Sequence, residues 1–530
     1  MTTNKVRRNH MYSTVTSGAV HGMESYLMQV EVDVSDGLPG MFMVGFMSAD
    51  VKEASERVRV SIRNAGIRLL PKKITVNLSP ASIRKQGIAV DLPVAVGILT
   101  AMEEIPAAAL HKTIIVGELG LNGEVKPVRG ILPIVRKALQ EGYATCIVPK
   151  ENAQEGAVIR GIKTIGVSTL TETIEYLRSA PGEGAPTITP AVVDIKSLFQ
   201  KGVTEGDEDF SDINGQSAVK RAVEVAAAGF HHILLVGPPG SGKSMVAKRI
   251  PGILPPLAEE ESMEVSTIYS VAGLLKPGQT LITKRPFLSP HHTITQSALA
   301  GGGNTPRPGV ISLAHRGVLF LDELAEFRRG TLDLLRQPLE DHAVHIARHG
   351  GTYSYPADFM LVGAMNPCPC GYFPDLNKCR CSEKDIKRYL GHVSGPILDR
   401  IDICIEAPRV AVEELDSSGA ANESSETIRK RILQAREIQR RRFQGTSLRF
   451  NADMGPTHVK KYCRMGQKEK LLLQRLFHTM DLSARAYHRV VKLSRTIADL
   501  DGSETINEAH ITEAACYRMT DMKYWNNGKD

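Results

Sequence analysis

A glycine-rich stretch between an apolar run and a helix-compatible run constrains this chain more than any other feature. Residues 237–244 read Gly-Pro-Pro-Gly-Ser-Gly-Lys-Ser and follow the apolar run Ile233–Val236. A buried strand that turns through glycines into a helix directs backbone N–H groups and the positive helix end at one point, where phosphates bind. The sequence therefore predicts a P-loop that binds a nucleoside di- or triphosphate. The expected cofactor-binding residues are Gly237, Pro238, Pro239, Gly240, Ser241, Gly242, Lys243 and Ser244.

Two further features of the sequence predict that ATP is hydrolysed as well as bound. Lys243 is expected to reach the β- and γ-phosphates, and Ser244 to hold Mg²⁺. The apolar run Gly317–Leu321 ends in Asp322 and Glu323, as in a central parallel strand that delivers carboxylates to its C-terminal edge. We expect Asp322 to be a partner of Mg²⁺ and Glu323 to orient the attacking water. A helix N-cap is the alternative for the two acids taken alone, and the upstream P-loop disfavours it.

A third strand and two arginines follow in the order that such a site needs. The run Phe359–Met365 ends at Asn366, whose amide is expected to position the water or to sense the γ-phosphate. Arg400 lies between apolar residues, and Arg485 opens a helix after Ser483. For any single arginine a surface ion pair is the default interpretation. A functional role for these two arginines can therefore be predicted only from the order of the motifs along the chain.

That order and spacing resemble the AAA+ ATPases of the magnesium-chelatase-like clade, and the rest of the chain resembles the YifB/ComM family within it. The resemblance implies an α/β fold: an AAA+ P-loop NTPase core with a C-terminal helical lid, preceded by a Lon-protease-like domain of the ribosomal S5 domain 2 type. The other segments that carry it are Gly22–Tyr26, Val30–Pro39, Val51–Val58, Ile74–Ala81, Gly117–Gly123 and Arg285–Thr293.

The same resemblance implies functional roles that the residues alone do not. Arg400 is expected to be an arginine finger that reaches the nucleotide of a neighbouring subunit, and Arg485 a second arginine sensor in the lid. The family implies a hexameric ATP-dependent DNA motor, some of whose members promote branch migration of recombination intermediates during natural transformation. The predicted partners are therefore DNA, single-stranded or branched, and further copies of this chain.

The chain divides into four predicted segments. Residues 1–178 alternate strand-like and helix-compatible runs and are expected to form the Lon-like domain. Residues 179–209 are expected to be a linker, because Ser179–Pro186 is rich in glycine and proline. The ATPase core is expected at 210–410 and the helical lid at 411–530. The lid contains a basic helix, Ile428–Arg442, whose charge is more typical of a solvated face than of a DNA site.

The N-terminal segment resembles a protease domain from which the catalytic residues are missing. Residues Gln86–Ala95 and Val125–Ile131 resemble the proteolytic domain of Lon, which uses a Ser-Lys dyad. Val94 aligns with the serine and Ile134 with the lysine. Neither side chain provides a nucleophile or a base, so we expect a Lon-like fold without protease activity. Hexamer assembly and DNA contact remain alternative uses of this domain.

Four closely spaced cysteines predict a metal site. Cys368, Cys370, Cys379 and Cys381 are soft ligands within one short loop, and the intervening proline and glycine favour a turn that would bring them together. One residue separates the members of each pair, a tighter spacing than in most zinc fingers. A structural Zn²⁺ is the prediction, and four reduced thiols in a loop are the alternative.

Two stretches are candidates for DNA contact. Residues Ala343–Tyr353 alternate and then turn at Gly-Gly, which predicts a β-hairpin with Arg348 and His349 at its tip. The second candidate is the insertion with Ser289–Thr293 and residues 301–309. Cations on such hairpins can follow a phosphate backbone. For His291, His292 and His349 individually, an ordinary exposed or hydrogen-bonded histidine is the favoured interpretation.

Composition is compatible with such a motor without identifying it. The 65 basic and 58 acidic residues give a net charge of +7, which permits nucleic-acid contact without requiring it. No signal peptide or membrane-spanning run is found, and we expect a cytoplasmic protein with reduced cysteines. Two other functions compete with the DNA motor. One is a chelatase-type ATPase that remodels a protein partner, and the other, an ATP-dependent protease, is disfavoured by the missing dyad.

Overall fold

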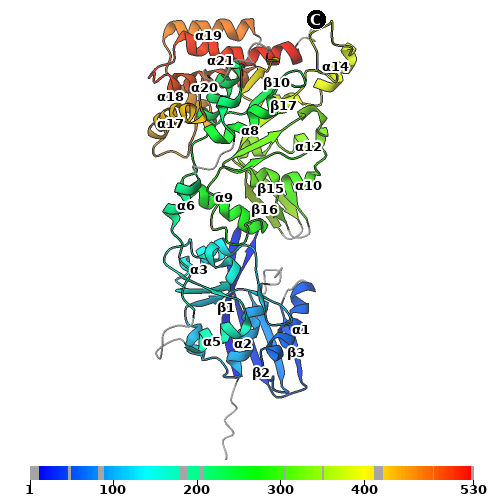
Figure 1. Ribbon diagram of the computed structural model, residues 1–530, viewed down its shortest axis with the longest axis vertical. Coiled ribbons are helices and arrows are strands. Elements are labelled where there is room, and N and C mark those ends of the chain that lie inside the picture. The colour runs from blue at the N-terminus through cyan, green and yellow to red at the C-terminus, as the bar shows by residue number, and fades with distance from the viewer. Residues whose placement is uncertain are drawn as a thin grey trace, which may run out of the picture.

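Two large sheets, each with its own helices, organise the chain in the computed structural model (Figure 1). The structure describes residues 11–45, 49–80, 89–179, 188–202, 208–303, 306–348, 351–410, 422–480 and 483–526. We call the described residues up to 179 the N-terminal region, those from 208 to 410 the P-loop region and those from 422 onward the C-terminal helical region. The N-terminal region forms one end of an elongated molecule, and the other two regions lie together at the opposite end.

The N-terminal sheet is mixed. Its order is β3 (Gly40–Val44), β4 (Lys73–Ser79), β2 (Glu24–Ser35), β1 (Met11–His21), β5 (Thr113–Ile115), β8 (Thr145–Pro149) and β9 (Lys163–Val167). Strands β1 and β2 form an antiparallel hairpin, whereas β5, β8 and β9 pair in parallel. The short strands β6 (Glu118–Leu119) and β7 (Val125–Lys126) form a separate ribbon.

One fully buried helix forms the centre of the N-terminal region. Every residue of α2 (Asp91–Ala101) is buried, as expected of a helix that is apolar on all sides. Asp91 at its start accepts hydrogen bonds from Arg57 Nε at 2.8 Å and from the backbone N–H of Leu119 at 3.3 Å. The other helices are α1 (Ala49–Asn64), α3 (Ile131–Gln140), α4 (Ala153–Gly156) and α5 (Leu170–Ser179).

Part of the predicted linker is ordered against the N-terminal region. Helix α6 (Ile195–Gly202) lies within residues 179–209, and Ile195 is buried among apolar side chains of the N-terminal region. The backbone N–H of Ala191 also donates to Thr164 O at 2.9 Å. This stretch therefore packs on the preceding region, and the four segment boundaries stay predictions.

The second sheet is parallel throughout. Its order is β11 (Phe287–Leu288), β14 (Val318–Leu321), β17 (Met360–Met365), β10 (Ile233–Val236) and β18 (Ile403–Glu406). All residues of β10, β14 and β17 are buried, which explains their continuous apolar runs in the sequence. The helices of this region are α7 (Ser217–Gly229), α8 (Lys243–Ile253), α9 (Glu259–Ala272), α10 (Gln296–Ala300), α11 (Val310–Leu313), α12 (Arg329–Asp333), α13 (Pro338–Asp341), α14 (Glu383–Leu390) and α15 (Gly395–Leu398).

Two antiparallel ribbons extend from the P-loop region towards the N-terminal region. Strands β15 (Ala343–Arg348) and β16 (Gly351–Pro356) form the longer one, and β12 (Gly301–Gly302) and β13 (Arg307–Pro308) the shorter one. Tyr353 on β16 is buried, and its ring lies 4.7 Å from the ring of His21 on β1. The longer ribbon therefore packs against the N-terminal region of its own chain.

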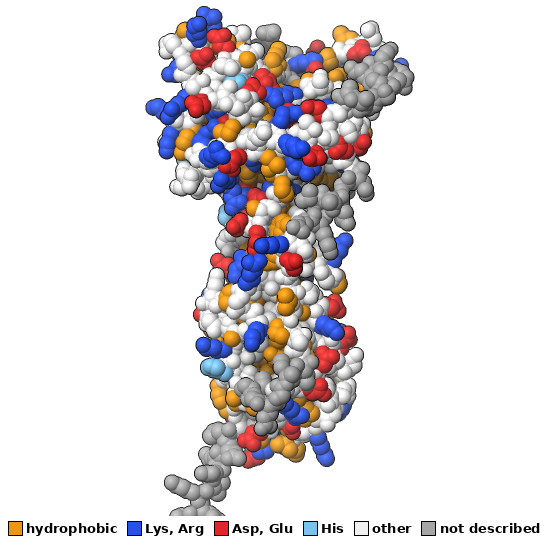
Figure 2. Space-filling view, turned by 60° about the vertical axis from the view of Figure 1, so that its left-hand side comes forward, with side chains coloured by type: hydrophobic (Ala, Val, Ile, Leu, Met, Phe, Trp, Pro, Cys, Tyr) orange, Lys and Arg blue, Asp and Glu red, His pale blue; other side chains and the backbone are white. Residues whose placement is uncertain are grey.

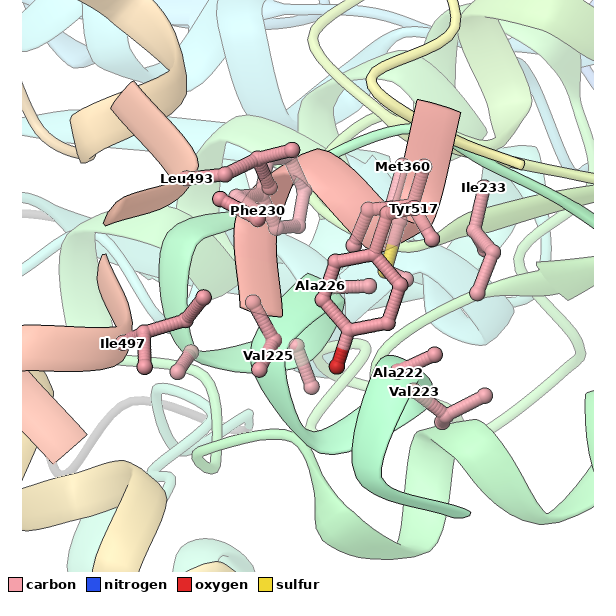
Figure 3. Close-up of a cluster of buried hydrophobic side chains, with 14 of the residues drawn as sticks. Ala222, Val223, Val225, Ala226, Phe230, Ile233, Met360, Leu493, Ile497 and Tyr517 are labelled. Carbon is pink, nitrogen blue, oxygen red and sulfur yellow. The ribbon is translucent and has the colours of Figure 1, made fainter. Parts of the chain in front are cut away.

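The C-terminal helical region packs on the same core as the second sheet. Its helices are α17 (Ser425–Arg442), α18 (Pro456–Tyr462), α19 (Gln467–Thr479), α20 (Ala484–Leu500) and α21 (Glu508–Asp521), followed by a π-helical turn, Met522–Asn526. Figure 3 shows Leu493, Ile497 and Tyr517 of these helices in one apolar cluster with Ala226 of α7 and Met360 of β17. None of the described helices has both the length and the apolar character needed to cross a bilayer.

Candidate functional site

The carboxyl ends of three adjacent strands bring together most of the predicted site. Strand β10 pairs with β17, and β17 pairs with β14, all in parallel. The loop 237–242 follows β10 and leads into α8, while Asp322 follows β14 and Asn366 follows β17. Because parallel strands end at the same edge of a sheet, these segments face one crevice, where α/β sheets bind ligands.

Lys243 lies inside this crevice and hydrogen-bonds to two carbonyls of its own loop and to Asn366. Its Nζ donates to Gly237 O at 2.8 Å, to Pro238 O at 2.9 Å and to Asn366 Oδ1 at 3.3 Å. Burial lowers the pKa of the Lys243 ammonium to about 8. The group is therefore mostly protonated at pH 7, and its present partners are neutral oxygens that a charged phosphate oxygen would outcompete.

Ser244 and Asp322 form the second part of the crevice. Ser244 Oγ donates to Asp322 Oδ2 at 2.6 Å, and the backbone N–H of Glu323 donates to Asp322 Oδ1 at 2.9 Å. A hydroxyl and a carboxylate in contact beside a phosphate-binding loop are the oxygen ligands that Mg²⁺ prefers, with waters and phosphate oxygens completing its octahedron. These residues therefore fit the ion that the sequence predicts.

Glu323 has an unusual backbone conformation and an unexpected partner. Its φ of 50° lies in the left-handed region, which non-glycine residues seldom adopt. Its carboxylate is exposed, and Oε2 lies 3.3 Å from Nδ1 of His292. The His292 ring in turn lies 4.0 Å from the ring of His291. The sequence placed these histidines in a candidate DNA-contact insertion but favoured ordinary exposed or hydrogen-bonded histidines, and in the structure His292 meets the candidate water-orienting acid.

Gln216 is a residue of the site that sequence reasoning missed. Its buried side chain donates through Nε2 to Ser241 O and, at 3.2 Å, to Pro408 O. It therefore joins the P-loop to the chain that follows β18. A single glutamine before a helix belongs to no spacing pattern, so nothing in the sequence marked it.

The two predicted arginines lie together and apart from the P-loop of their own chain. Arg400 Nη2 lies 2.7 Å from Glu340 Oε2, and Arg485 Nη2 lies 3.9 Å from Glu340 Oε1. Both line a cavity of about 430 Å³ whose other walls include Asp358 and Lys492, and no residue of the P-loop lines it. Among the described residues, neither arginine contacts Lys243 or Ser244. Glu340 was not identified from the sequence.

The four predicted cysteines converge on one point next to this crevice. All four Sγ atoms lie within 4.8 Å of one another. Cys368 Sγ lies 3.4 Å from Cys370 Sγ and 3.8 Å from Cys379 Sγ, and the latter two are 3.6 Å apart. Zn–S bonds of about 2.3 Å in a tetrahedron place sulfurs about 3.8 Å apart, so the cluster has the dimensions of a four-thiolate metal site.

The cysteine loop also contacts the P-loop. Gly371 has a φ of +84°, and a Cβ built on it would lie 2.4 Å from Cδ of Pro239. Only glycine allows this close approach, because any side chain would displace the proline ring. Asn366 lies two residues before Cys368. A metal held by the cysteines would thus fix a loop that lies between the P-loop and the candidate sensor.

Other predicted positions are placed as follows. Arg348 ends β15 opposite Gly351 and is exposed, while His349 lies outside the described residues. Val94 is fully buried within α2, and Ile134 is buried on α3. The pair is apolar and enclosed, and the protease-inactive interpretation stays a prediction.

Three family models match consecutive parts of the chain. The model of magnesium chelatase, subunit ChlI, matches residues 209–415; a second model, subunit ChlI of Mg-chelatase, matches 30–152; and the ChlI C-terminal model matches 422–518. Competence protein ComM of Haemophilus influenzae is 40% identical over 506 residues, covering 95% of this chain and 97% of that protein. The chain belongs to the YifB/ComM family of magnesium-chelatase-like AAA+ ATPases.

Further relatives agree with this membership. The uncharacterised protein YifB of Escherichia coli is 40% identical over 509 residues, covering 96% of this chain and 97% of that protein. Lon protease 2 of Bacillus subtilis is 30% identical over 196 residues, covering 32% of this chain and 34% of that protein. Together with the parallel sheet and the C-terminal helices, these matches confirm the predicted fold class. An AAA+ ATPase family implies ATP and Mg²⁺ as cofactors.

Substitution of Lys243 should impair nucleotide binding, whereas substitution of Glu323 should impair hydrolysis and leave binding intact. We expect Lys243→Ala to weaken ATP binding about tenfold or more, because it removes a charge-assisted contact with the phosphates. Glu323→Gln should retain ATP binding and lower turnover by about 10²- to 10⁴-fold, because it removes the group that orients the attacking water. Equilibrium binding of a fluorescent ATP analogue and steady-state phosphate release measure the two effects.

Glu326→Gln provides the matched control, because Glu326 is another exposed acid three positions further along the chain. It should change neither binding nor turnover. Normal turnover by the Glu323→Gln protein would contradict the role given to Glu323.

Proposed function

We propose that this chain is an ATP-dependent DNA motor that assembles as a hexamer and promotes branch migration or other remodelling of recombination intermediates. The observation that supports hydrolysis is the placement of Lys243, Ser244, Asp322 and Asn366 at one sheet edge. The proposal of DNA as substrate is supported by membership of the YifB/ComM family along nearly the whole chain and by the name competence protein of the Haemophilus influenzae relative.

In this proposal each residue of the crevice has one task. The backbone N–H groups of residues 237–242 and the Lys243 ammonium bind the phosphates of ATP. Ser244 and Asp322 hold Mg²⁺, which neutralises charge on the phosphate oxygens. Glu323 orients the attacking water once its carboxylate leaves His292, and Asn366 positions that water or contacts the γ-phosphate. The reaction then depends on positioning and charge.

The positions of Arg400 and Arg485 support the assembly of several copies of this chain. Charge develops on the phosphate oxygens during transfer, and a guanidinium near the γ-phosphate stabilises it. Arg400 and Arg485 lie together at Glu340 and contact no residue of the crevice in the described structure. We propose that they complete the site of a neighbouring subunit. A head-to-tail interface of this kind closes into a ring when its rotation divides the full circle, which is compatible with a hexamer.

DNA is proposed to meet the ribbon β15–β16. Arg348 is exposed at the end of this ribbon and lacks an ion pair with any described residue. Figure 2 shows Lys and Arg side chains gathered at the end formed by the P-loop and C-terminal regions, with acidic side chains among them. Exposed basic side chains can contact phosphates without sequence preference.

Remodelling of a protein partner is a second candidate function, and the family matches favour it. The three family models that match this chain describe subunit ChlI of magnesium chelatase. The same crevice could therefore drive remodelling of a protein partner in place of DNA. A protease role is not proposed, because Val94 and Ile134 offer no nucleophile or base at the dyad positions.

We also propose that the cysteine cluster binds one structural Zn²⁺ in each chain. Protein purified without chelators should contain about one zinc per chain, and removal of the metal should lower both thermal stability and ATP affinity, because the loop contacts Pro239. Elemental analysis and a thermal melt with and without chelator measure these effects. Cys379→Ser should abolish zinc binding, whereas Cys516→Ser, at an exposed cysteine outside the cluster, should not. Absence of zinc in the purified protein would refute the proposal.

The DNA proposal is tested by junction movement with purified protein. We expect ATP hydrolysis to rise when single-stranded or branched DNA is added, and three- or four-stranded junctions to be moved without cleavage. Arg348→Ala should abolish junction movement and leave basal hydrolysis within about twofold, because the proposal assigns Arg348 to DNA contact and gives it no part in the P-loop crevice. Binding should weaken steeply with salt. The control is Arg475→Ala, an exposed arginine on α19.

A wild-type protein that hydrolyses ATP at a rate indifferent to every form of DNA, and that moves no junction, would overturn the DNA proposal. The protein-remodelling function would then be preferred. If Arg348→Ala and Arg475→Ala both leave junction movement intact, DNA movement stands but does not use the ribbon.

A further inference from the structure

A cavity between the N-terminal and P-loop regions has no role in the functions proposed above. It encloses about 690 Å³. Its walls come from the end of β1, the chain before α3, the end of α9, and the two ribbons, represented by His21, Arg129, Ser270, Arg307 and Tyr353. In Figure 1 these elements meet at the junction of the two regions. Both regions therefore contribute walls to this cavity.

Arg129 is an unneutralised cation in the wall of this cavity. The side chain is about half-buried, and its Nη1 is fully buried without a hydrogen-bond partner. No described carboxylate forms an ion pair with it. Burial of a guanidinium N–H without an acceptor costs free energy that a folded protein normally recovers through a partner. The rest of the side chain lines the cavity without an ion pair to any described residue, so an anion that enters the cavity would meet an unneutralised guanidinium.

A second unpaired cation lies next to the first. Arg307 on β13 is exposed to the cavity and makes no side-chain hydrogen bond or ion pair with any described residue. Burial and the charge of Arg307 both lower the pKa of the Arg129 guanidinium. Two like charges held together in this way repel each other, so an anion between them would remove the repulsion.

None of the carboxylates in the described cavity wall pairs with Arg129 or Arg307. Glu155 is buried, and its carboxylate accepts from Ser270 Oγ at 2.5 Å and from the backbone N–H of Leu132 at 2.9 Å. Glu118 interacts with Lys126 and Arg57. Glu53 and Glu151 also line the cavity, and neither forms an ion pair with a described residue. The two arginines thus keep their donors available.

The wall that carries Arg129 is fixed to both regions. The backbone N–H of Gly130 donates to Ser270 O at 3.0 Å, across the junction of α3 and α9. Gly130 has a φ of +77°, and a Cβ there would lie 2.5 Å from a methyl group of Val20. The backbone that carries Arg129 is therefore held in place at the edge of the cavity, which lowers the cost of ordering this wall around a ligand.

We propose that Arg129 and Arg307 form a phosphate-binding site in this cavity. A phosphate group presents several oxygens, so it can accept from two planar guanidinium forks at once, which a single carboxylate does less well. The phosphate belongs either to the backbone of a DNA strand that passes between the regions or to a free nucleotide or pyrophosphate. The proposal concerns binding alone and does not depend on ATP hydrolysis or on DNA movement.

Equilibrium binding to full-length protein distinguishes the two sources. The protein carries Lys243→Ala, so that phosphate binding at the P-loop is suppressed, and the probes are pyrophosphate and a short single-stranded oligonucleotide. Arg307→Ala and Arg129→Gln should each weaken binding of one probe about tenfold, the loss expected for a charge-assisted hydrogen bond. The probe that is affected identifies the source. Arg160→Ala, at an exposed arginine of the same region that does not line the cavity, should leave both affinities unchanged.

Arg307 is exposed, so Arg307→Ala remains informative even if Arg129→Gln impairs folding, which a thermal melt would reveal. The proposal is overturned if neither probe binds the Lys243→Ala protein, or if both bind the Arg307→Ala and Arg160→Ala proteins with equal affinity. It survives a failure of junction movement, because pyrophosphate binding is measured without DNA.

Discussion

The parallel pairing of β10 with β17 and β18 is the constraint on which the rest of this structure depends. Ile233 lies opposite both Val362 and Ile403, so the P-loop strand is buried between two neighbours. Because the strands run in one direction, every polar residue that follows an apolar run is delivered to the same edge. Lys243, Asp322 and Asn366 meet there although they lie far apart in the sequence. The cysteine loop then rests on Pro239 at that edge.

In the described structure the charged groups of the proposed hydrolytic site each have a partner from their own chain. Lys243 bonds to loop carbonyls, Glu323 meets His292, and Arg400 pairs with Glu340. Nucleotide, attacking water and a neighbouring subunit would each have to replace one of these partners. The exchanges are between polar groups, so their net free energies are small compared with the gross interactions. Such a site can respond to assembly and to ligands without rearrangement of its sheet.

Much of this arrangement was predictable because it follows chain-local patterns. The apolar runs at Ile233–Val236 and Phe359–Met365, the loop between Pro238 and Lys243, and the hairpin near Arg348 each have a periodicity or spacing that the sequence displays. The contacts of Glu340, Gln216 and His292, and the cavity beside Arg129, were not predicted, because they join residues distant in the chain through single side chains. Helix α6 was missed because the glycine- and proline-rich residues before it suggested a linker throughout.

The central claim is that two subunits share each hydrolytic site, and a subunit-mixing measurement tests it most directly. Arg400→Ala chains keep an intact P-loop, and Lys243→Ala chains keep an intact arginine; each alone should be inactive. Random mixing in equal amounts should restore about one quarter of wild-type ATPase activity per interface, because one interface in four pairs an intact P-loop with an intact arginine. Chains carrying both substitutions, mixed with Arg400→Ala chains, should restore none. Absence of recovery in rings confirmed to be mixed would contradict the claim.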